Sequence, residues 1–229
     1  MQDILLIIPS YNEEKNIEKV VGELEEHFPQ LDYIVVNDGS TDRTAQICRE
    51  RGYRLLSLPV NLGLAGCFQA GMKYAYEKGY RYAIQFDGDG QHRPEYVEAI
   101  RRKMDEGYDI VIGSRFVNQA KDMSPRMLGS RLISGAIRLT TGVKIADPTS
   151  GMRMFNREMI KEFALKLNYG PEPDTISFLL KQGARIAEVP VTISERLAGE
   201  SYLKPMVALT YMVRMLISIL LIQNFRKRN

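Results

Sequence analysis

The sequence predicts an α/β fold in which a mostly parallel sheet is flanked by helices. Short apolar runs of strand length alternate, over the first 115 residues, with segments whose apolar residues recur at helical spacing. A polar or glycine-containing tip follows each apolar run. Strands that alternate with helices usually pair in parallel, and such sheets bind ligands at the carboxyl ends of their strands. The tips therefore mark the edge where a site is expected.

The elements follow in order along the chain. The predicted strands are residues 3–8, 33–36, 54–58, 80–86, 109–113 and 185–191. The predicted helices are residues 13–28, a segment capped by Ser40 or Thr41 and ending near Arg51, 67–78, a segment starting at Pro94, 125–141, and a segment from the loop at 168–174 to Gln182. Met152, Met154 and Phe155 are expected in the core.

Five polar tips are expected to line a single cleft at the carboxyl edge of the sheet. They are residues 11–13, 38–40, 61–66, 87–91 and Arg115. The first strand is followed by neither GxxxxGK[ST] nor GxGxxG, which excludes a P-loop nucleotidase and a standard dinucleotide-binding protein.

Asp87 and Asp89 lie one residue apart in the turn QFDGDGQH, directly after an apolar strand. Carboxylates at this spacing can converge on one hard divalent cation, to which Gln91 or His92 adds a ligand and phosphate oxygens complete an octahedron. The alternative is an Asp-Gly turn on the surface, because Asp and Gly are also common turn residues.

Composition limits the classes of function. The net charge of +3 is too small to indicate nucleic acid, and residues 201–229 hold five basic residues and no acid. Cys48 and Cys67 form no metal-binding or CxxC pattern, and the N-terminus shows no secretory signal. The chain is therefore expected to stay in the cytoplasm.

Residues 206–222 are almost continuously apolar, and Thr210, Arg214 and Ser218 form one narrow polar stripe at helical spacing. The segment is short for a span, so an interfacial helix is expected, with Arg226, Lys227 and Arg228 on anionic headgroups of the inner leaflet. The alternative is a homo-oligomer interface through residues 205–225.

Seven motifs resemble, in order, those of the inverting family-two glycosyltransferases, and in particular their dolichyl-phosphate mannose synthase and polyprenyl-phosphate glycosyltransferase branch. They are IPSYNEE (8–14), VNDGSTD (36–42), NLGLAG (61–66), DGDGQH (87–92), GSR (113–115), DPTSGMR (147–153) and ERLAGES (195–201). The resemblance implies a GT-A fold over residues 1–203. Residues 1–115 form its donor-binding half, 116–203 its acceptor half and lid, and 204–229 a C-terminal membrane-associating or oligomerising helix.

The same resemblance implies roles for individual residues. A UDP- or GDP-sugar is held by Pro9, Tyr11, Glu13, Asp38, Gly63 and Asp87, and Arg196 in the lid contacts the donor diphosphate. Mg²⁺ or Mn²⁺ is bound by Asp87, Asp89 and Gln91, of which Asp89 is also counted as catalytic. The phosphate of a polyprenyl acceptor is received by Arg115, Arg131, Ser150 and Arg153.

The acceptor stays open at this point. A polyprenyl phosphate is already anionic and needs no general base, whereas a sugar hydroxyl on a lipid-linked polysaccharide needs a carboxylate to take its proton. Glu172 and Asp174 in the loop GPEPD are candidates for that base, although Asp174 is also a candidate helix cap. A further alternative is a non-catalytic nucleotide-sugar-binding subunit of a membrane complex.

Overall fold

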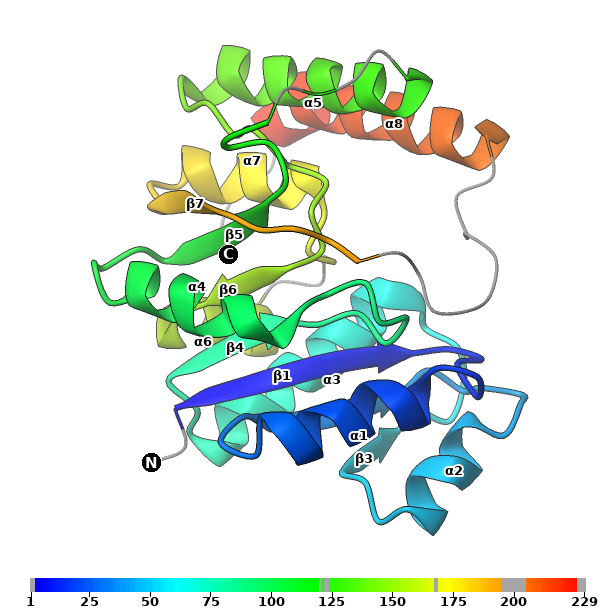
Figure 1. Cartoon of the computed structure of the whole chain (residues 1–229). Coiled ribbons are helices and arrows are strands. Elements are labelled where there is room, and N and C mark those ends of the chain that lie inside the picture. Colours follow the sequence, from blue (N-terminus) through cyan, green and yellow to red (C-terminus); the bar gives the residue numbers. More distant parts are fainter. Residues whose placement is uncertain (1–2, 120, 122–123, 167–168, 195–204, 226–229) are drawn as a thin grey trace.

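A computed structural model describes residues 3–119, 121, 124–166, 169–194 and 205–225 (Figure 1). Within these residues seven strands form one sheet in the order β3-β2-β1-β4-β6-β5-β7. Their bounds are β1 (Ile4–Ser10), β2 (Asp32–Asn37), β3 (Leu55–Ser57), β4 (Tyr82–Gln85), β5 (Ile110–Ser114), β6 (Arg153–Phe155) and β7 (Ile186–Pro190).

The sheet is mostly parallel, which confirms the predicted α/β class. β1 pairs in parallel with β2 and β4, β2 with β3, and β5 with β7. The exception is β6, which lies antiparallel between β4 and β5. This strand is absent from the predicted set because three residues are too few to show a periodic pattern.

The helices cover both faces of the sheet. They are α1 (Ile17–His27), α2 (Thr44–Glu50), α3 (Gly63–Lys78), α4 (Val97–Met104), α5 (Pro125–Thr141), α6 (Arg157–Leu165), α7 (Pro173–Lys181) and α8 (Pro205–Leu220), with 3₁₀ turns at Pro94–Tyr96 and Ile222–Asn224. Side chains alternate across β1, so Leu5 and Ile7 join the core under α3, α5, α6, α7 and α8. Leu6 and Ile8 join a second core under α1 and α4.

Three predicted helix starts are wrong. α1 begins at Ile17 rather than at residue 13. α2 begins at Thr44 rather than beside Ser40 or Thr41, because the Ser40 hydroxyl accepts a hydrogen bond from the backbone N–H of Asn12 instead of capping a helix. α3 begins at Gly63, so most of the predicted glycine loop is the first turn of that helix.

Helices α5 and α8 lie side by side at one end of the molecule, and both contact α7 (Figure 1). α8 falls within the segment for which a C-terminal helix is predicted. Among the described helices, none combines the length and the apolar character needed to cross a bilayer.

Candidate functional site

The first strand tips meet at the carboxyl edge of the sheet. Asn12, which has a φ of 56°, donates its backbone N–H to Ser40 Oγ at 3.0 Å, and its Oδ1 accepts the N–H of Thr41 at 2.9 Å. The tip after β2 reaches the start of α3 in the same way. Asp38 accepts the N–H groups of Leu62 at 2.7 Å and Gly63 at 2.8 Å. Three of the predicted tips therefore form one connected wall.

The residues predicted to hold the donor lie on this wall. Tyr11 exposes 47% of its surface. Pro9 is the penultimate residue of β1 and lies beside the turn that carries the carboxylates, where a Cβ on Gly88 would come within 3.2 Å of the Pro9 carbonyl. The backbone N–H of Glu13 donates to Thr44 Oγ1 at 2.8 Å. The carboxylate of Asp38 fixes the loop that presents Gly63, so its most evident contribution is to shape the cleft. Contact of these residues with a nucleotide stays a prediction.

The two carboxylates follow β4, as predicted. Asp89 is buried, and its Oδ1 accepts the backbone N–H of Gln91 at 3.0 Å. Asp87 is half-buried, and its Oδ1 accepts a hydrogen bond from Gln85 Nε2 at 3.2 Å. His92 is turned towards Asp87 rather than outwards. Its Nδ1 accepts the Asp87 backbone N–H at 2.9 Å, and its Nε2 lies 3.3 Å from Asp87 Oδ2.

This turn fits a divalent cation that is shared with a substrate. The described residues contain no cluster of three or more His, Cys, Asp or Glu side chains able to hold a metal ion by themselves. Mg²⁺ typically takes one or two carboxylates and completes its shell with water and substrate phosphates. The space beside Asp87 is kept open by Gly151, where a Cβ would come within 2.9 Å of Asp87 Oδ2. That Asp87, Asp89 and Gln91 hold a cation together with a diphosphate stays a prediction.

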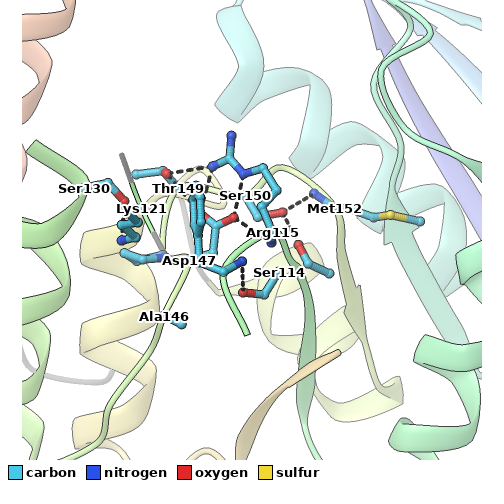
Figure 2. A network of polar contacts seen from close by, with 12 residues as sticks. Ser114, Arg115, Lys121, Ser130, Ala146, Asp147, Thr149, Ser150 and Met152 are labelled. Carbon is cyan, nitrogen blue, oxygen red and sulfur yellow. Dashed lines mark hydrogen bonds and ion pairs between the residues drawn. The ribbon is translucent and has the colours of Figure 1, made fainter. Parts of the chain in front are cut away.

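A second part of the site is built around the ion pair between Arg115 and Asp147 (Figure 2). Arg115 follows β5, and its Nε and Nη2 donate to the two carboxylate oxygens of Asp147 at 2.7 and 2.8 Å. Arg115 Nη2 also donates to Thr149 Oγ1 at 3.2 Å. Burial by itself raises the pKa of Asp147, but the hydrogen bonds and charge of Arg115 outweigh it, and the pKa is lowered from its ordinary value.

A carboxylate of β7 binds the backbone of the segment that carries Asp147. Glu188 accepts the backbone N–H groups of Ala146 at 2.6 Å and Asp147 at 2.8 Å. Asp147 is thereby fixed by its backbone as well as by its ion pair. The sequence did not predict roles for Glu188 or Asp147. Glu188 lies 41 positions from Asp147, and Asp147 lies 32 positions from Arg115, so no local pattern shows that these residues meet.

Two residues predicted to receive the acceptor phosphate are instead buried in contacts with the protein. Ser150 donates to the carbonyl of Gly113 (Figure 2). Arg153 is 2% exposed and donates to the carbonyls of Pro171 and Pro148. The guanidinium of Arg153 therefore joins the segment at 147–153 to the loop at 170–174. Direct contact of either residue with a phosphate stays a prediction.

A basic pocket of about 300 Å³ opens between α5 and the segments on either side of it. Four of its described lining residues are basic and none is acidic. The lining consists of Phe116, Gln119, Lys121, Arg131, Ser134, Gly135, Arg138, Lys144, Ile145 and Ala146. Arg131, one of the predicted acceptor ligands, lies here, whereas Arg115 is occupied by Asp147 nearby.

Lys121 is one of the cations of this basic pocket that the sequence did not predict as site residues. Its Nζ donates to Ser130 Oγ at 2.7 Å and to Ser134 Oγ at 3.3 Å, both on α5. Burial lowers the pKa of Lys121, although the carboxylate of Asp147 opposes the shift. A desolvated ammonium held by neutral hydroxyls is a favourable partner for an incoming anion.

The side chains of Glu172 and Asp174, the two candidate bases, both contact α8. The Tyr211 hydroxyl donates to Glu172 Oε2, and Ser218 Oγ donates to Asp174 Oδ2 at 2.7 Å. Burial, together with the charge of Glu172, raises the pKa of Tyr211. The alternative interpretation of Asp174 as a helix cap is wrong, because the N-cap of α7 is Glu172 and Asp174 lies in the first turn. Arg196, predicted to contact the donor diphosphate, lies outside the described residues.

Comparison with known proteins agrees with this arrangement. The sequence profile described as Glycosyl transferase family 2 matches residues 5–163. A polyprenol monophosphomannose synthase of Mycolicibacterium smegmatis is 30% identical over 87% of this chain and 80% of its own length. An undecaprenyl-phosphate mannosyltransferase of Micrococcus luteus is 32% identical over 86% of both chains.

The solved structures show the fold. Glucosyl-3-phosphoglycerate synthase of Mycobacterium tuberculosis, in complex with Mn²⁺, UDP and glucosyl-3-phosphoglycerate, superposes with a TM-score of 0.69. The match covers 96% of this chain and 79% of that one at 22% identity. The seven-stranded sheet and its flanking helices are thus those of a GT-A fold.

Proposed function

The chain belongs to glycosyl transferase family 2, and from that premise we propose that it moves a sugar from a nucleotide diphosphate sugar to the phosphate of a polyprenyl carrier. The observation that carries the proposal is the basic pocket, in which Lys121 and Arg131 share the lining with Ala146. Ala146 belongs to the segment at 146–153, which also borders Asp87 at Gly151. Relatives that are 30 and 32% identical bear names that specify polyprenol and undecaprenyl phosphate as acceptors.

The carboxylate turn supplies the donor side of this reaction. Asp87, Asp89 and Gln91 would hold Mg²⁺ or Mn²⁺ with the donor diphosphate, and the ion when bound neutralises charge on the departing nucleoside diphosphate. Asp38 shapes the wall of the cleft through the N–H groups of Leu62 and Gly63. Transfer is a single displacement that inverts the anomeric carbon.

The acceptor side needs cations rather than a base. A phosphate oxygen is already a nucleophile at neutral pH, so binding and orientation are sufficient. Lys121 and Arg131 provide positive charge for it, while Ser134 adds a hydroxyl. Glu172 and Asp174 are engaged by Tyr211 and Ser218, which supports a phosphate acceptor over a sugar hydroxyl.

The carrier lipid requires the protein to work at a membrane surface, which we propose is the cytoplasmic face. α5 exposes Leu128, Leu132 and Leu139, and the adjacent α8 exposes Leu209, Val213 and Ile217. Arg138 and Lys144 lie beside this apolar face in the lining of the basic pocket. An apolar helix face with flanking cations is typical of binding to an anionic interface.

The test is transfer of label from a panel of radiolabelled UDP- and GDP-sugars, with Mn²⁺, to undecaprenyl phosphate in detergent. We expect a solvent-extractable, acid-labile product. Because hydrogen bonds to charged groups contribute about 1.5–3 kcal/mol, Lys121→Ala should lower kcat/KM for the acceptor roughly 10- to 100-fold and leave the KM for the donor unchanged. Lys161→Ala, an exposed lysine on α6, is the matched control.

Two results would contradict the proposal. Donor hydrolysis without transfer to the lipid phosphate would indicate a sugar hydroxyl acceptor. Neither transfer nor hydrolysis with any donor of the panel would indicate a non-catalytic nucleotide-sugar-binding protein.

A further inference from the structure

His92 is buried and held in one orientation by its neighbours. Its side chain is 2% exposed, its ring lies edge-on to Phe86 with centroids 5.6 Å apart, and Nδ1 accepts the Asp87 N–H at 2.9 Å. A Cβ on Gly151 would come within 3.2 Å of His92 Cε1, so the segment at 147–153 also lies close against the ring. The ring therefore has little freedom to swing outwards and ligate an ion.

The hydrogen bond at Nδ1 determines the tautomer of the neutral ring. A nitrogen that accepts a backbone N–H carries no proton, so the proton is on Nε2. Nε2 lies 3.3 Å from Asp87 Oδ2, which places the positive end of an N–H dipole beside that oxygen. On the other side of the same carboxylate, Gln85 Nε2 donates to Oδ1 at 3.2 Å.

We propose that His92 is a positioning residue that fixes the Asp87 carboxylate, through Nε2, in the orientation required by the divalent cation. The inference rests on the proposed function, since it concerns the cation of the same donor site. Both oxygens of Asp87 contact a neutral donor, and each keeps a lone pair directed elsewhere. Carboxylates that bind metals are commonly oriented in this way by hydrogen-bonding neighbours, whose removal lowers metal affinity roughly 10- to 100-fold.

Two substitutions separate the two contacts of the ring. In His92→Asn, the amide oxygen can replace Nδ1 as acceptor for the Asp87 N–H, but nothing reaches Oδ2. In His92→Gln, the longer amide can bring its NH₂ group to the position of Nε2, but the acceptor at Nδ1 is lost. The first variant thus tests the contact with Oδ2 and the second the contact with the backbone.

The experiment measures Mn²⁺ affinity from the loss of the free-ion electron paramagnetic resonance signal, in the presence of UDP and, in parallel, of GDP. We expect His92→Asn to bind Mn²⁺ at least 10-fold more weakly, within the range typical of such neighbours. His92→Gln should stay within about 3-fold of wild type, because it keeps a donor beside Oδ2. His27→Asn, an exposed histidine on α1, is the matched control, and Asp89→Ala shows the loss expected when a ligand is removed.

Thermal unfolding separates positioning from stability. A purely structural role predicts that both variants lower the melting temperature while Mn²⁺ affinity of the folded fraction is kept. If His92→Asn does not fold, Gly151→Ala tests the same carboxylate, since its Cβ would come within 2.9 Å of Asp87 Oδ2 and should weaken Mn²⁺ binding.

The outcomes distinguish this inference from the proposed function. Equal Mn²⁺ affinity in His92→Asn and wild type, or an equal loss of affinity in both His92 variants, would overturn the proposed role of Nε2. Neither result would affect the proposed function. A wild-type protein that binds no Mn²⁺ with either nucleotide overturns the cation site and the inference together.

Discussion

Several carboxylates of this protein hold segments of the chain in place through hydrogen bonds. Asp38 fixes the start of α3, Glu188 fixes the backbone at Ala146 and Asp147, and Asp174 receives Ser218. Sequence motifs identify such residues as important without showing which side chain is engaged by the protein. Each engaged carboxylate therefore allows a test that separates support from chemistry.

Glu172 provides one such test. Its Oε2 accepts the Tyr211 hydroxyl, and an amide oxygen can accept the same hydrogen bond, so Glu172→Gln should keep transferase activity within a few-fold of wild type. A general base contributes roughly 10²- to 10⁴-fold, so a loss of that size on steady-state kcat would restore Glu172 as the base for a hydroxyl acceptor.

The two cysteines give a prediction about pH. Burial raises the pKa of Cys48 to about 11 and that of Cys67 to about 12, from an ordinary value of 9.0. The thiolate fraction at pH 8 is then about 100-fold or more below that of an unfolded chain, and alkylation should be slower by a similar factor. The native protein should resist a thiol reagent at pH 8 and react fully in denaturant.

The same shifts affect stability in alkaline solution. Because the folded pKa values lie above the unfolded value, the stabilisation from the protonated thiols is complete below about pH 9 and is lost as pH rises towards 11–12. Urea titrations at pH 8 and pH 10.5 should show a falling free energy of unfolding. Rapid labelling of either thiol in the native protein would show that its side chain is not buried.

At the scale of elements, the segment at 146–153 connects the parts of the site. It contacts the basic pocket through Ala146, Arg115 through Asp147, Asp87 through Gly151, and the loop at 170–174 through Arg153. It ends in β6, the antiparallel strand inserted between β4 and β5. A displacement of this segment would therefore reach the donor and the acceptor sides together.

Asp147→Asn tests the anchor of this segment. The substitution removes the charge of Asp147 and leaves Arg115 without its ionic partner. Removing one partner of a buried ion pair lowers the free energy of unfolding by about 3–5 kcal/mol. Since the side chain of Arg115 is 21% exposed, we expect the lower limit, about 3 kcal/mol at pH 7. Glu50→Gln, which removes the exposed partner of Arg43, should cost less than about 0.5 kcal/mol.

The effect should depend on pH in a defined direction. The folded pKa of Asp147 is lowered, so its stabilisation is present above the ordinary value of 3.8 and is lost as pH falls through the folded pKa. Urea titrations below about pH 4 should therefore show wild type approaching the variant. A gap that stays constant down to pH 3 would mean that the ion pair is not its source.

The parts of this architecture that sequence predicts are those with local signals. Apolar runs and helical spacing predict the parallel strands and α5, whose bounds agree with the structure at Pro125–Thr141. The turn with Asp87 and Asp89 is visible because both carboxylates directly follow a predicted strand, which the structure shows as β4. Contacts such as Tyr211 with Glu172, 39 residues apart, leave no local pattern, which is why α8 was not expected to contact the loop at 170–174.

At the scale of the whole molecule, α5 and α8 form a pair that joins the core on one side and is exposed on the other. Ile133, Ile137, Met215 and Ile219 are buried beneath the pair. Leu132 and Leu139 of α5 expose 52% and 79% of their surfaces. This geometry suits a surface that rests on lipid while the basic pocket faces the headgroups.

We expect the protein to co-float with vesicles that contain anionic phospholipid, and less so as salt is raised, because attraction between lysine or arginine and such lipids is screened. Replacing Leu132 and Leu139 together by Glu should abolish flotation and transfer to carrier lipid in vesicles while leaving Mn²⁺ binding with UDP or GDP intact. Leu165→Glu on α6, which is 58% exposed and lies away from the pair, is the matched control.

The alternative to lipid binding is that a second copy of the chain covers this face. The double variant of Leu132 and Leu139 distinguishes the two possibilities. If the apolar surfaces of α5 and α8 pair with a second copy, wild type should sediment as a dimer without lipid, and the double variant should become a monomer. Flotation of wild type and variant to the same extent would then contradict the membrane role. Because lipid binding and self-association bury the same leucines, the two outcomes exclude each other for this surface.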